Sequence, residues 1–431
     1  MKHLILFTLL ALLSMGISYA DIKHDVLSDR GKLGSNYYAY PAKNIKKQTK
    51  APAGYTPFYI SHYGRHGSRF HYSEDDWVFL NNVLLKADSA GALTDLGKSL
   101  LERTQKMTIE WHNRAGDLTQ LGADQHRGIA IRMYKNFPQV FKGDANINAY
   151  ASTSGRCIVS MAAFNEELRS QNPKIKLNVE SSKRIMSFIN EFSFDRAAKC
   201  TENGEWKQAY SSIWERYFKP EPMMKALFKN QDYVKKNVDP VSFIRKFYEI
   251  TGSLQGIDNI DYNFNDIWTP DDWYGNWVLQ NAWWYGVGGT SPLTNQCEVP
   301  SAKPILRNII EEAEMAIAQN ADKKTASKAL RATLRFGHDT GVLPLASMLQ
   351  VEGANAQVTN LNKLAEQWQD FNIIPMAANF QFIFYKSSKK DSQILVKVML
   401  NENEVKLPIE ENTAPYYSWE GFKKFYGPAL Q

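Results

Sequence analysis

The stretch Pro-Phe-Tyr-Ile-Ser-His-Tyr-Gly-Arg-His-Gly-Ser-Arg at residues 57–69 joins a strand-like run to a loop punctuated by glycine. Residues 57–63 are rich in aromatic and β-branched side chains in an alternating pattern, which is typical of a β-strand. Glycines then interrupt the chain, which indicates that the strand ends there. The sequence therefore places Arg65, His66 and Arg69 on a loop at the carboxyl end of a strand.

Two later junctions repeat this pattern. Residues 147–151 predict a second strand, followed by Ser-Thr-Ser-Gly and a helix that runs from Arg156 to about residue 170. Residues 330–336 alternate between apolar and polar side chains and end at Gly-His-Asp-Thr-Gly, in which His338 and Asp339 precede another expected helix. Because ligands in open α/β folds bind at the carboxyl ends of strands, we expect the three junctions to meet at one edge of a sheet.

The remaining elements predict a protein of the α/β class. Helices are expected at residues 93–111 and 119–137, and final strands at 380–384, 394–400 and 405–407. Residues 175–328 have a helical pattern without clear strands. The simplest arrangement is one α/β domain built from residues 21–174 and 329–431, with a mainly α-helical domain at 175–328 inserted into it.

A cluster of tryptophans lies inside the helical segment, at Trp273, Trp277, Trp283 and Trp284. At helical spacing such residues most often belong to a packed core, so burial is the expected outcome. Stacking against a sugar is the weaker alternative.

Residues 1–20 predict a signal peptide. Lys2 gives a short basic start, residues 4–13 are almost entirely apolar, and Ser18-Tyr19-Ala20 predicts cleavage before Asp21. The apolar run is too short to cross a bilayer as a helix. We therefore expect an exported protein, periplasmic or extracellular, without a membrane anchor.

Cysteine content and charge exclude several classes of protein. Cys157, Cys200 and Cys297 are too widely spaced for a zinc site. Cys157 is expected to be a buried thiol, whereas Cys200 and Cys297 lie in polar, turn-like sequence and either form a disulfide or remain free. The net charge is +6, but there is no basic block of the kind that binds nucleic acid, so no nucleic-acid partner is expected. The sequence leaves the oligomeric state open.

The residues at the three junctions are suited to a phosphoryl group. Arginine offers planar, permanently charged donors that match phosphate oxygens, and the junctions supply Arg65, Arg69 and Arg156. A neutral imidazole such as His66 can attack phosphorus and divide hydrolysis into two displacements, while a carboxylic acid protonates the leaving oxygen. No cluster of metal-ligand residues accompanies them, so neither a metal nor a cofactor is expected. The histidines outside the junctions are given no role: His62, His71, His112 and His126.

These stretches resemble a known family. Residues 65–69 resemble the RHGxR signature of the histidine phosphatases, and residues 337–340 resemble the distal HD motif of their acid-phosphatase and phytase branch. Ser154-Gly155-Arg156, followed by Ser160 and Phe164, is similar to the third arginine of that branch at its helix start. Residues 118–122 resemble its LTxxG segment. The resemblance runs from about residue 55 to the C-terminal strands.

The resemblance implies a role for each matched residue and a fold with an α/β domain and an α-helical insertion. His66 would be the nucleophile and Asp339 the proton donor, whereas the residues that hold the phosphate would be Arg65, Arg69, Arg156 and His338. The family pattern commonly continues as RHGxRxP, but here Phe70-His71 follows, which leaves the shape of the loop open. Multiple inositol polyphosphate phosphatases typically carry His-Ala-Glu distally, so the His-Asp pair is more similar to the phytase and acid-phosphatase type.

The sequence therefore predicts an exported phosphomonoesterase that acts through a phosphohistidine. Inositol polyphosphates such as phytate are the first choice of substrate, and a broad-specificity acid phosphatase is a close second. A non-catalytic phosphate-ester-binding protein is the main alternative, although binding alone would require neither His66 nor Asp339. A mutase-like transferase is less expected, because an exported enzyme meets no cytosolic pool of sugar phosphates.

Overall fold

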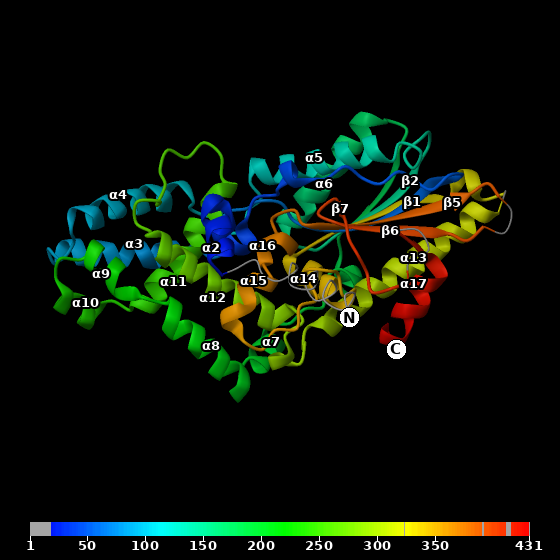
Figure 1. The fold of residues 1–431 in the computed structure, drawn as a ribbon. Coiled ribbons are helices and arrows are strands. Elements are labelled where there is room, and N and C mark those ends of the chain that lie inside the picture. The colour runs from blue at the N-terminus through cyan, green and yellow to red at the C-terminus, as the bar shows by residue number, and fades with distance from the viewer. Residues whose placement is uncertain (1–18, 323, 390–391, 411–414, 431) are drawn as a thin grey trace, which may run out of the picture.

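A computed structural model of the chain describes residues 19–322, 324–389, 392–410 and 415–430 (Figure 1). Its central sheet has the strand order β3-β2-β4-β1-β5-β6-β7, and β8 pairs with β6. The four neighbours β3, β2, β4 and β1 run parallel, whereas β5 is antiparallel to β1 and β6 is antiparallel to β5. The strands are β1 Tyr55–Arg65, β2 Asn146–Ala151, β3 Lys176–Glu180, β4 Leu330–Gly337, β5 Asn379–Ser387, β6 Leu395–Leu400, β7 Asn403–Glu404 and β8 Tyr416–Ser418.

Helices cover both faces of this sheet (Figure 1). On one face, α5 Gln120–Asn136 and α6 Gly155–Gln171 pack against side chains such as Ile60 and Leu334. On the other face, α13 Lys303–Ala321, α14 Asp339–Met348 and α17 Trp419–Tyr426 lie against Tyr59, Phe382 and their neighbours. Successive side chains of a strand point to opposite faces, so the alternation in the sequence supplies both cores.

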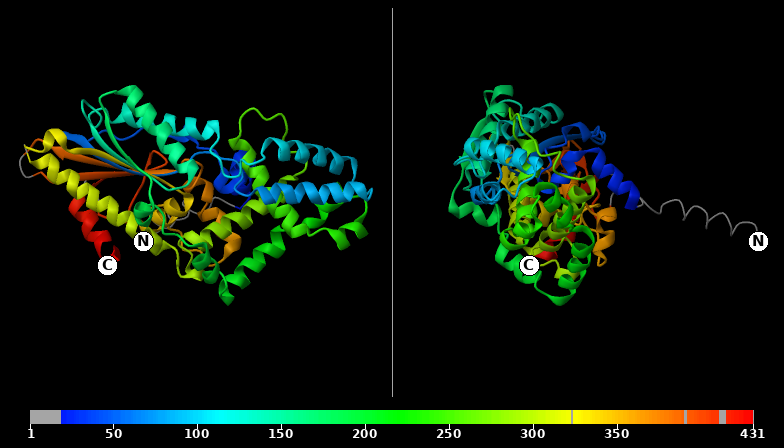
Figure 2. Two further views of the ribbon diagram at one scale, coloured as in Figure 1. Left: turned by 180° about the vertical axis from the view of Figure 1, so that it is seen from behind. Right: turned by 90° about the vertical axis from the view of Figure 1, so that its left-hand side faces the viewer.

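A second group of helices lies at the end of the molecule away from the sheet (Figures 1 and 2). This helical lobe comprises α3 Glu74–Ser89, α4 Asp95–Glu110, α8 Gly204–Tyr217, α9 Pro220–Leu227, α10 Gln231–Asn237, α11 Pro240–Ser253 and α12 Pro270–Gly288. Several begin at a capping side chain; the Asp239 carboxylate accepts from two N–H groups of α11, ahead of Pro240. The shorter helices are α2 Tyr19–Ser28, α7 Phe194–Cys200, α15 Leu364–Gln367 and α16 Asp370–Ile373.

The structure confirms the α/β class and most of the expected elements. The expected strands at 57–63, 147–151, 330–336, 380–384 and 394–400 and the helices at 93–111, 119–137 and 156–170 are all present. The strand expected at 405–407 is wrong, because β7 ends at Glu404; the Val405 N–H still donates to the Val398 carbonyl of β6 at 3.1 Å, and the chain then leaves the sheet. The N–H of Leu407 donates to the Tyr417 hydroxyl at 2.8 Å, and Pro408 has no N–H to continue a ladder.

The packing crosses the expected domain boundaries. The expectation that residues 175–328 contain no strand is wrong, because β3 pairs with β2 at the edge of the sheet, and α13 from the same segment packs on β1 and β4. Conversely, α3 and α4 pack against α11 and α9 of the helical lobe. The hydrophobic surface against which a segment packs, rather than its position in the chain, therefore determines the part of the fold to which it belongs. The division at residues 174/175 and 328/329 stays a prediction.

The tryptophans of α12 are mostly core residues, as expected. Trp273, Trp277 and Trp284 are buried, whereas Trp283 is half-buried. The predicted signal peptide lies almost entirely in residues 1–18, outside the described residues, and stays a prediction. In the described part of the chain, no helix is long and apolar enough to cross a membrane.

The structure shows how the three cysteines are paired. Cys200 and Cys297 form a disulfide, with their Cα atoms 6.4 Å apart, and Cys157 is a buried free thiol. The disulfide ties the end of α7 to the segment before α13.

We predict that Cys200→Ser lowers the free energy of unfolding by about 2–4 kcal/mol, because the bridge closes a long loop in the unfolded chain. Urea denaturation with and without reductant measures the loss. Thiol titration in denaturant should find one reactive thiol before reduction and three after it. Three thiols before reduction would show that the disulfide does not form.

Two histidines of the core are predicted to make the fold sensitive to acid. His62 and His126 are fully buried, and their ring nitrogens have no hydrogen-bond partner among the described residues. Burial lowers the pKa of each to about 3, with a smaller contribution from the neighbouring His126 in the case of His62. The unfolded chain binds a proton on each below about pH 6.5, whereas the folded chain does not until about pH 3. Stability should therefore fall as the pH falls through this window.

For each of these histidines, acidification from pH 7 to pH 5 should lower the free energy of unfolding by about 2 kcal/mol. Urea denaturation at both pH values, compared for the wild type and for a His62→Leu/His126→Leu variant, measures the effect. His112→Leu, which removes an exposed imidazole, is the matched control. An equal loss on acidification in the wild type and the double variant would contradict the prediction.

Candidate active site

The three predicted junctions meet at one edge of the sheet. β1 and β4 are in register from Ile60 to Arg65, so the residues that follow them lie side by side, and the N–H of His66 donates to the Gly337 carbonyl at 3.0 Å. The N–H of Ser152, after β2, donates to the Phe336 carbonyl at 2.9 Å. Beside this edge lies a cavity of about 750 Å³, and five of the six predicted site residues line it: His66, Arg69, Arg156, His338 and Asp339. Arg65 is fully buried behind them.

The loop after β1 depends on a close approach between two glycines. A Cβ on Gly67 would lie 2.2 Å from the Gly122 carbonyl oxygen, and a Cβ on Gly122 would lie equally close to the Ser68 oxygen. Only glycine fits at either position, which gives a physical reason for both glycine-containing stretches. The Gly67 N–H donates to Ser160 at 3.2 Å and the Ser68 N–H donates to Gln125 at 2.9 Å, so α5 and α6 hold the loop.

The imidazole of His66 is held with one nitrogen free. Its Nδ1 lies 2.9 Å from the Gly67 carbonyl oxygen, which can only accept, so Nδ1 carries the proton and Nε2 keeps a lone pair. Burial lowers the pKa of His66 well below its usual value, and Arg65, Arg156 and Arg69 lower it further. The ring is therefore neutral at ordinary pH, as a nucleophile must be.

Two arginines at the cavity keep donors free. The Arg69 Nη1 donates to the Phe70 carbonyl at 2.9 Å and contacts the Tyr37 hydroxyl at 3.4 Å, and its guanidinium lies 4.9 Å from the centre of the Tyr37 ring. Arg156 lies at the start of α6. Within the described residues, the Nε of each arginine is buried without a hydrogen-bond partner. Unsatisfied buried donors of this kind are suited to an anion.

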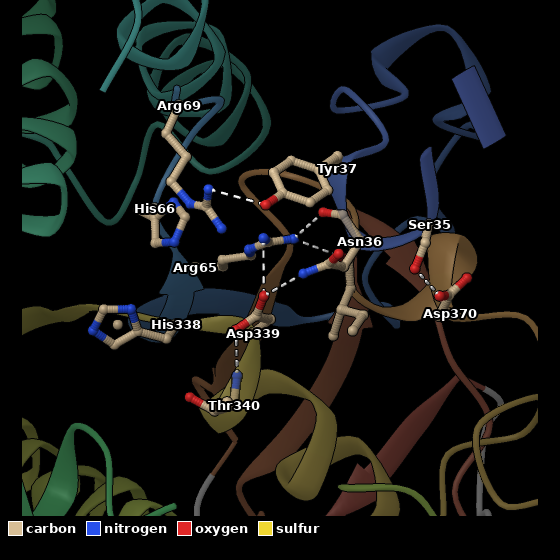
Figure 3. Close-up of polar contacts among 12 residues, drawn as sticks. Ser35, Asn36, Tyr37, Arg65, His66, Arg69, His338, Asp339, Thr340 and Asp370 are labelled. Atoms are coloured by element: carbon tan, nitrogen blue, oxygen red, sulfur yellow. Dashed lines mark hydrogen bonds and ion pairs between the residues drawn. The ribbon is translucent and has the colours of Figure 1, made fainter. Parts of the chain in front are cut away.

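His338 and Asp339 lie at the start of α14. The His338 Nε2 is 3.0 Å from the Ser152 hydroxyl, and burial together with Arg156 lowers the pKa of His338 to about 4. The Asp339 carboxylate forms an ion pair with Arg65 at 2.9 Å and accepts from Asn36 at 2.8 Å (Figure 3). Burial raises the pKa of Asp339, but Arg65, Asn36 and Arg69 outweigh burial and hold it below its usual value.

Sequence reasoning missed the contribution of the N-terminal segment. Asn36 and Tyr37 end a 3₁₀-helical stretch, Arg30–Tyr37, and reach the site from about thirty residues before it. The Asn36 carbonyl also accepts from Arg65. Neither residue belongs to a recognisable motif, so their role appears only in the folded chain.

The outer wall of the cavity comes from the helical lobe and the chain leading to it. It carries one basic and one acidic residue, Arg245 and Glu249 of α11, beside a group of aromatic side chains. These aromatic residues are Phe194, Tyr210, Trp283 and Trp284. In the described part of the chain, no group of three His, Cys, Asp or Glu side chains is placed to hold a metal ion. Independence from metals stays a prediction.

Comparison with known proteins identifies the family. Residues 40–401 match the model of the histidine phosphatase superfamily, branch 2. The chain belongs to this superfamily. Multiple inositol polyphosphate phosphatase 1 of Gallus gallus is 21% identical over 338 residues, which cover 74% of this chain and 71% of the relative. The prediction of a histidine phosphatase family member is confirmed.

Solved structures of histidine phosphatases share the fold. The Bifidobacterium longum multiple inositol polyphosphate phosphatase, in complex with inositol hexasulfate, has a TM-score of 0.73 at 17% identity and covers 90% of this chain and 96% of its own. The phytase from D. castellii has a TM-score of 0.67 at 14% identity and covers 93% of this chain and 85% of its own. Both kinds of enzyme share the fold, so the fold does not choose between them.

Proposed function

We propose that this histidine phosphatase is a phosphomonoesterase that acts through phosphorylated His66. The observation that carries the proposal is a neutral, buried imidazole whose Nδ1 is fixed by the Gly67 carbonyl, in a cavity lined by arginines with unsatisfied donors. In the first step the free Nε2 forms a bond to phosphorus as the ester oxygen leaves. In the second step water displaces the histidine and releases inorganic phosphate.

The other site residues divide the remaining tasks. Arg69, Arg156 and His338 line the cavity and would bind the phosphate oxygens, where they stabilise charge in the transition state. Arg65 would add positive charge from behind and hold Asp339 in place. Asp339 would donate a proton to the leaving oxygen.

Asp339 must gain its proton when substrate binds. In the empty site the arginines keep its pKa low, so the carboxylate is ionised. A phosphate dianion would offset that positive charge and raise the pKa of Asp339 in the complex. Activity should therefore be highest in acid, because the donor loses its proton as the pH rises.

We consider two classes of substrate, in order of preference. Inositol polyphosphates are the first choice, supported by the names of the similar proteins, which include multiple inositol polyphosphate phosphatases and phytases. A broad-specificity acid phosphatase is favoured by the outer wall, where aromatic side chains accompany a single arginine and Glu249 opposes polyanions. We further propose that the enzyme acts outside the cytoplasm, supported by the signal-like residues 1–20.

The function is tested by phosphate release from phytate, a sugar phosphate and an aryl phosphate in chelated, metal-free buffer across pH. We expect turnover of at least one substrate, with an acidic optimum. His66→Ala should abolish turnover, because the nucleophile is lost. Its circular dichroism spectrum should match that of the wild type, which shows that the variant folds. A folded His66→Ala protein with near-wild-type activity would refute the assignment, and phosphate binding without any turnover would support the non-catalytic alternative.

The role of Asp339 is tested by its effect on different leaving groups. An alkyl alkoxide needs a proton as it departs, whereas a nitrophenolate does not. In Asp339→Asn, single-turnover phosphorylation by an alkyl phosphate should therefore slow roughly 10²–10⁴-fold, and phosphorylation by a nitrophenyl phosphate much less. Equal losses would assign Asp339 to positioning, and Glu249, the other acidic residue that lines the cavity, would become the candidate proton donor.

A further inference from the structure

The position where the family pattern commonly has proline is occupied by His71, whose side chain is completely buried. The backbone around it is fixed by its neighbours: the Phe70 N–H donates to the Asp117 carbonyl at 3.0 Å, and the Gly116 N–H donates to the His71 carbonyl at 2.9 Å. Backbone hydrogen bonds therefore fix this part of the loop without a proline, and the imidazole is free to make side-chain contacts.

His71 is the middle member of a chain of polar contacts that ends at the phosphate site. Its Nε2 lies 2.8 Å from Asp76 Oδ2, and its Nδ1 lies 3.0 Å from the Tyr37 hydroxyl. The Tyr37 hydroxyl in turn contacts Arg69 Nη1 at 3.4 Å (Figure 3). At the other end, Lys246 of α11 donates to the second oxygen of Asp76. We call these five residues the His71 relay.

The donors and acceptors of the relay agree in direction. The Asp76 carboxylate only accepts, so the Nε2 of His71 donates to it, and the Nδ1, 3.0 Å from the Tyr37 hydroxyl, is placed to accept from that hydroxyl. The Tyr37 oxygen is then left to accept from Arg69. Hydrogen bonds aligned in this way polarise one another, so each member strengthens the next.

The relay also places its acidic residue, Asp76, two side chains away from Arg69. Among the described residues, no acidic side chain forms an ion pair with Arg69; its side chain contacts a carbonyl, a hydroxyl and the rings of Tyr37 and Tyr72. Arg65, by contrast, is paired directly with Asp339. The relay can therefore orient the Arg69 guanidinium while leaving its charge for a phosphate.

We propose that His71, held by Asp76 and Lys246, is a positioning residue that orients Tyr37 and through it fixes Arg69 in the phosphate site. This inference rests on the proposed phosphate-binding role of Arg69. It links phosphate affinity to the helical lobe, because Asp76 belongs to α3 and Lys246 to α11.

The test is a double-mutant cycle between His71→Ala and Tyr37→Phe in the full-length protein, with inorganic phosphate as the probe in calorimetry. Each single variant should weaken phosphate binding roughly tenfold, the loss expected for one hydrogen bond to a charged group. The double variant should bind phosphate as tightly as whichever single variant binds it less tightly, because both changes break the same relay. With an aryl phosphate, KM should rise more than kcat falls.

Further variants separate positioning from folding. His71→Asn places an amide oxygen near the position of Nδ1, where it can accept from Tyr37, so it should recover part of the binding lost in His71→Ala. His112→Ala is the matched control, because it removes an exposed histidine that pairs with Glu74 of the same helix α3. If His71→Ala does not fold, Tyr37→Phe, which removes a single oxygen atom, still tests the relay.

The outcomes also distinguish the relay from the proposed function. Additive losses in the cycle, or phosphate binding by Tyr37→Phe within twofold of the wild type, would overturn the relay whether or not the enzyme turns over. Absence of turnover in a wild type that binds phosphate would refute the proposed function, and the cycle would still decide on the relay.

Discussion

The ion pair between Arg65 and Asp339 is the interaction on which the arrangement of the site depends. It joins the end of β1 to the first turn of α14, and Arg65 Nη1 also donates to the carbonyls of Asn36 and Ile374. Four segments that are distant in sequence are thereby held together at one point. A buried ion pair is costly to desolvate, and hydrogen bonds to its other polar atoms offset that cost. Asn36 and the Thr340 N–H bond to the carboxylate, whereas the Arg65 Nε has no partner among the described residues.

The charge gathered around this pair determines the protonation of its neighbours. Burial and the nearby arginines lower the pKa values of His66 and His338, so both rings are neutral in a site with a net positive charge. The same arginines keep Asp339 ionised until a substrate brings its own negative charge. Burial and the arginines thus act together on His66, the proposed nucleophile, whereas they oppose each other on Asp339, the proposed proton donor.

Much of this could be predicted from the sequence, because its signals are local. The alternation along β1, β4 and β5 specifies two faces of a sheet, and the glycine-containing junctions mark the loops that follow strands. The contact between Gly67 and Gly122 appears only in the folded chain. Asn36, Tyr37 and His71 could not be predicted, since their partners are set by the tertiary fold rather than by spacing. The packing crosses the expected domain boundaries for a similar reason: no local pattern in residues 74–110 or 176–180 indicates which hydrophobic surface each will contact.

Helix α11 contributes three charged residues of the helical lobe to the site and its support. About one turn of α11 carries Arg245, Lys246 and Glu249, whose side chains make different contacts. Lys246 bonds to Asp76 at the back of the His71 relay, whereas Arg245 and Glu249 line the outer wall of the cavity. Arg245 is itself held by Asn276 and Gln280 of α12, so the two helices set this wall together. A shift of α11 would change the charge that meets the substrate's leaving group and the support of Arg69 at the same time. The proposed roles therefore imply that specificity and phosphate affinity are coupled through this helix, although the proposed catalytic residues lie at the edge of the sheet.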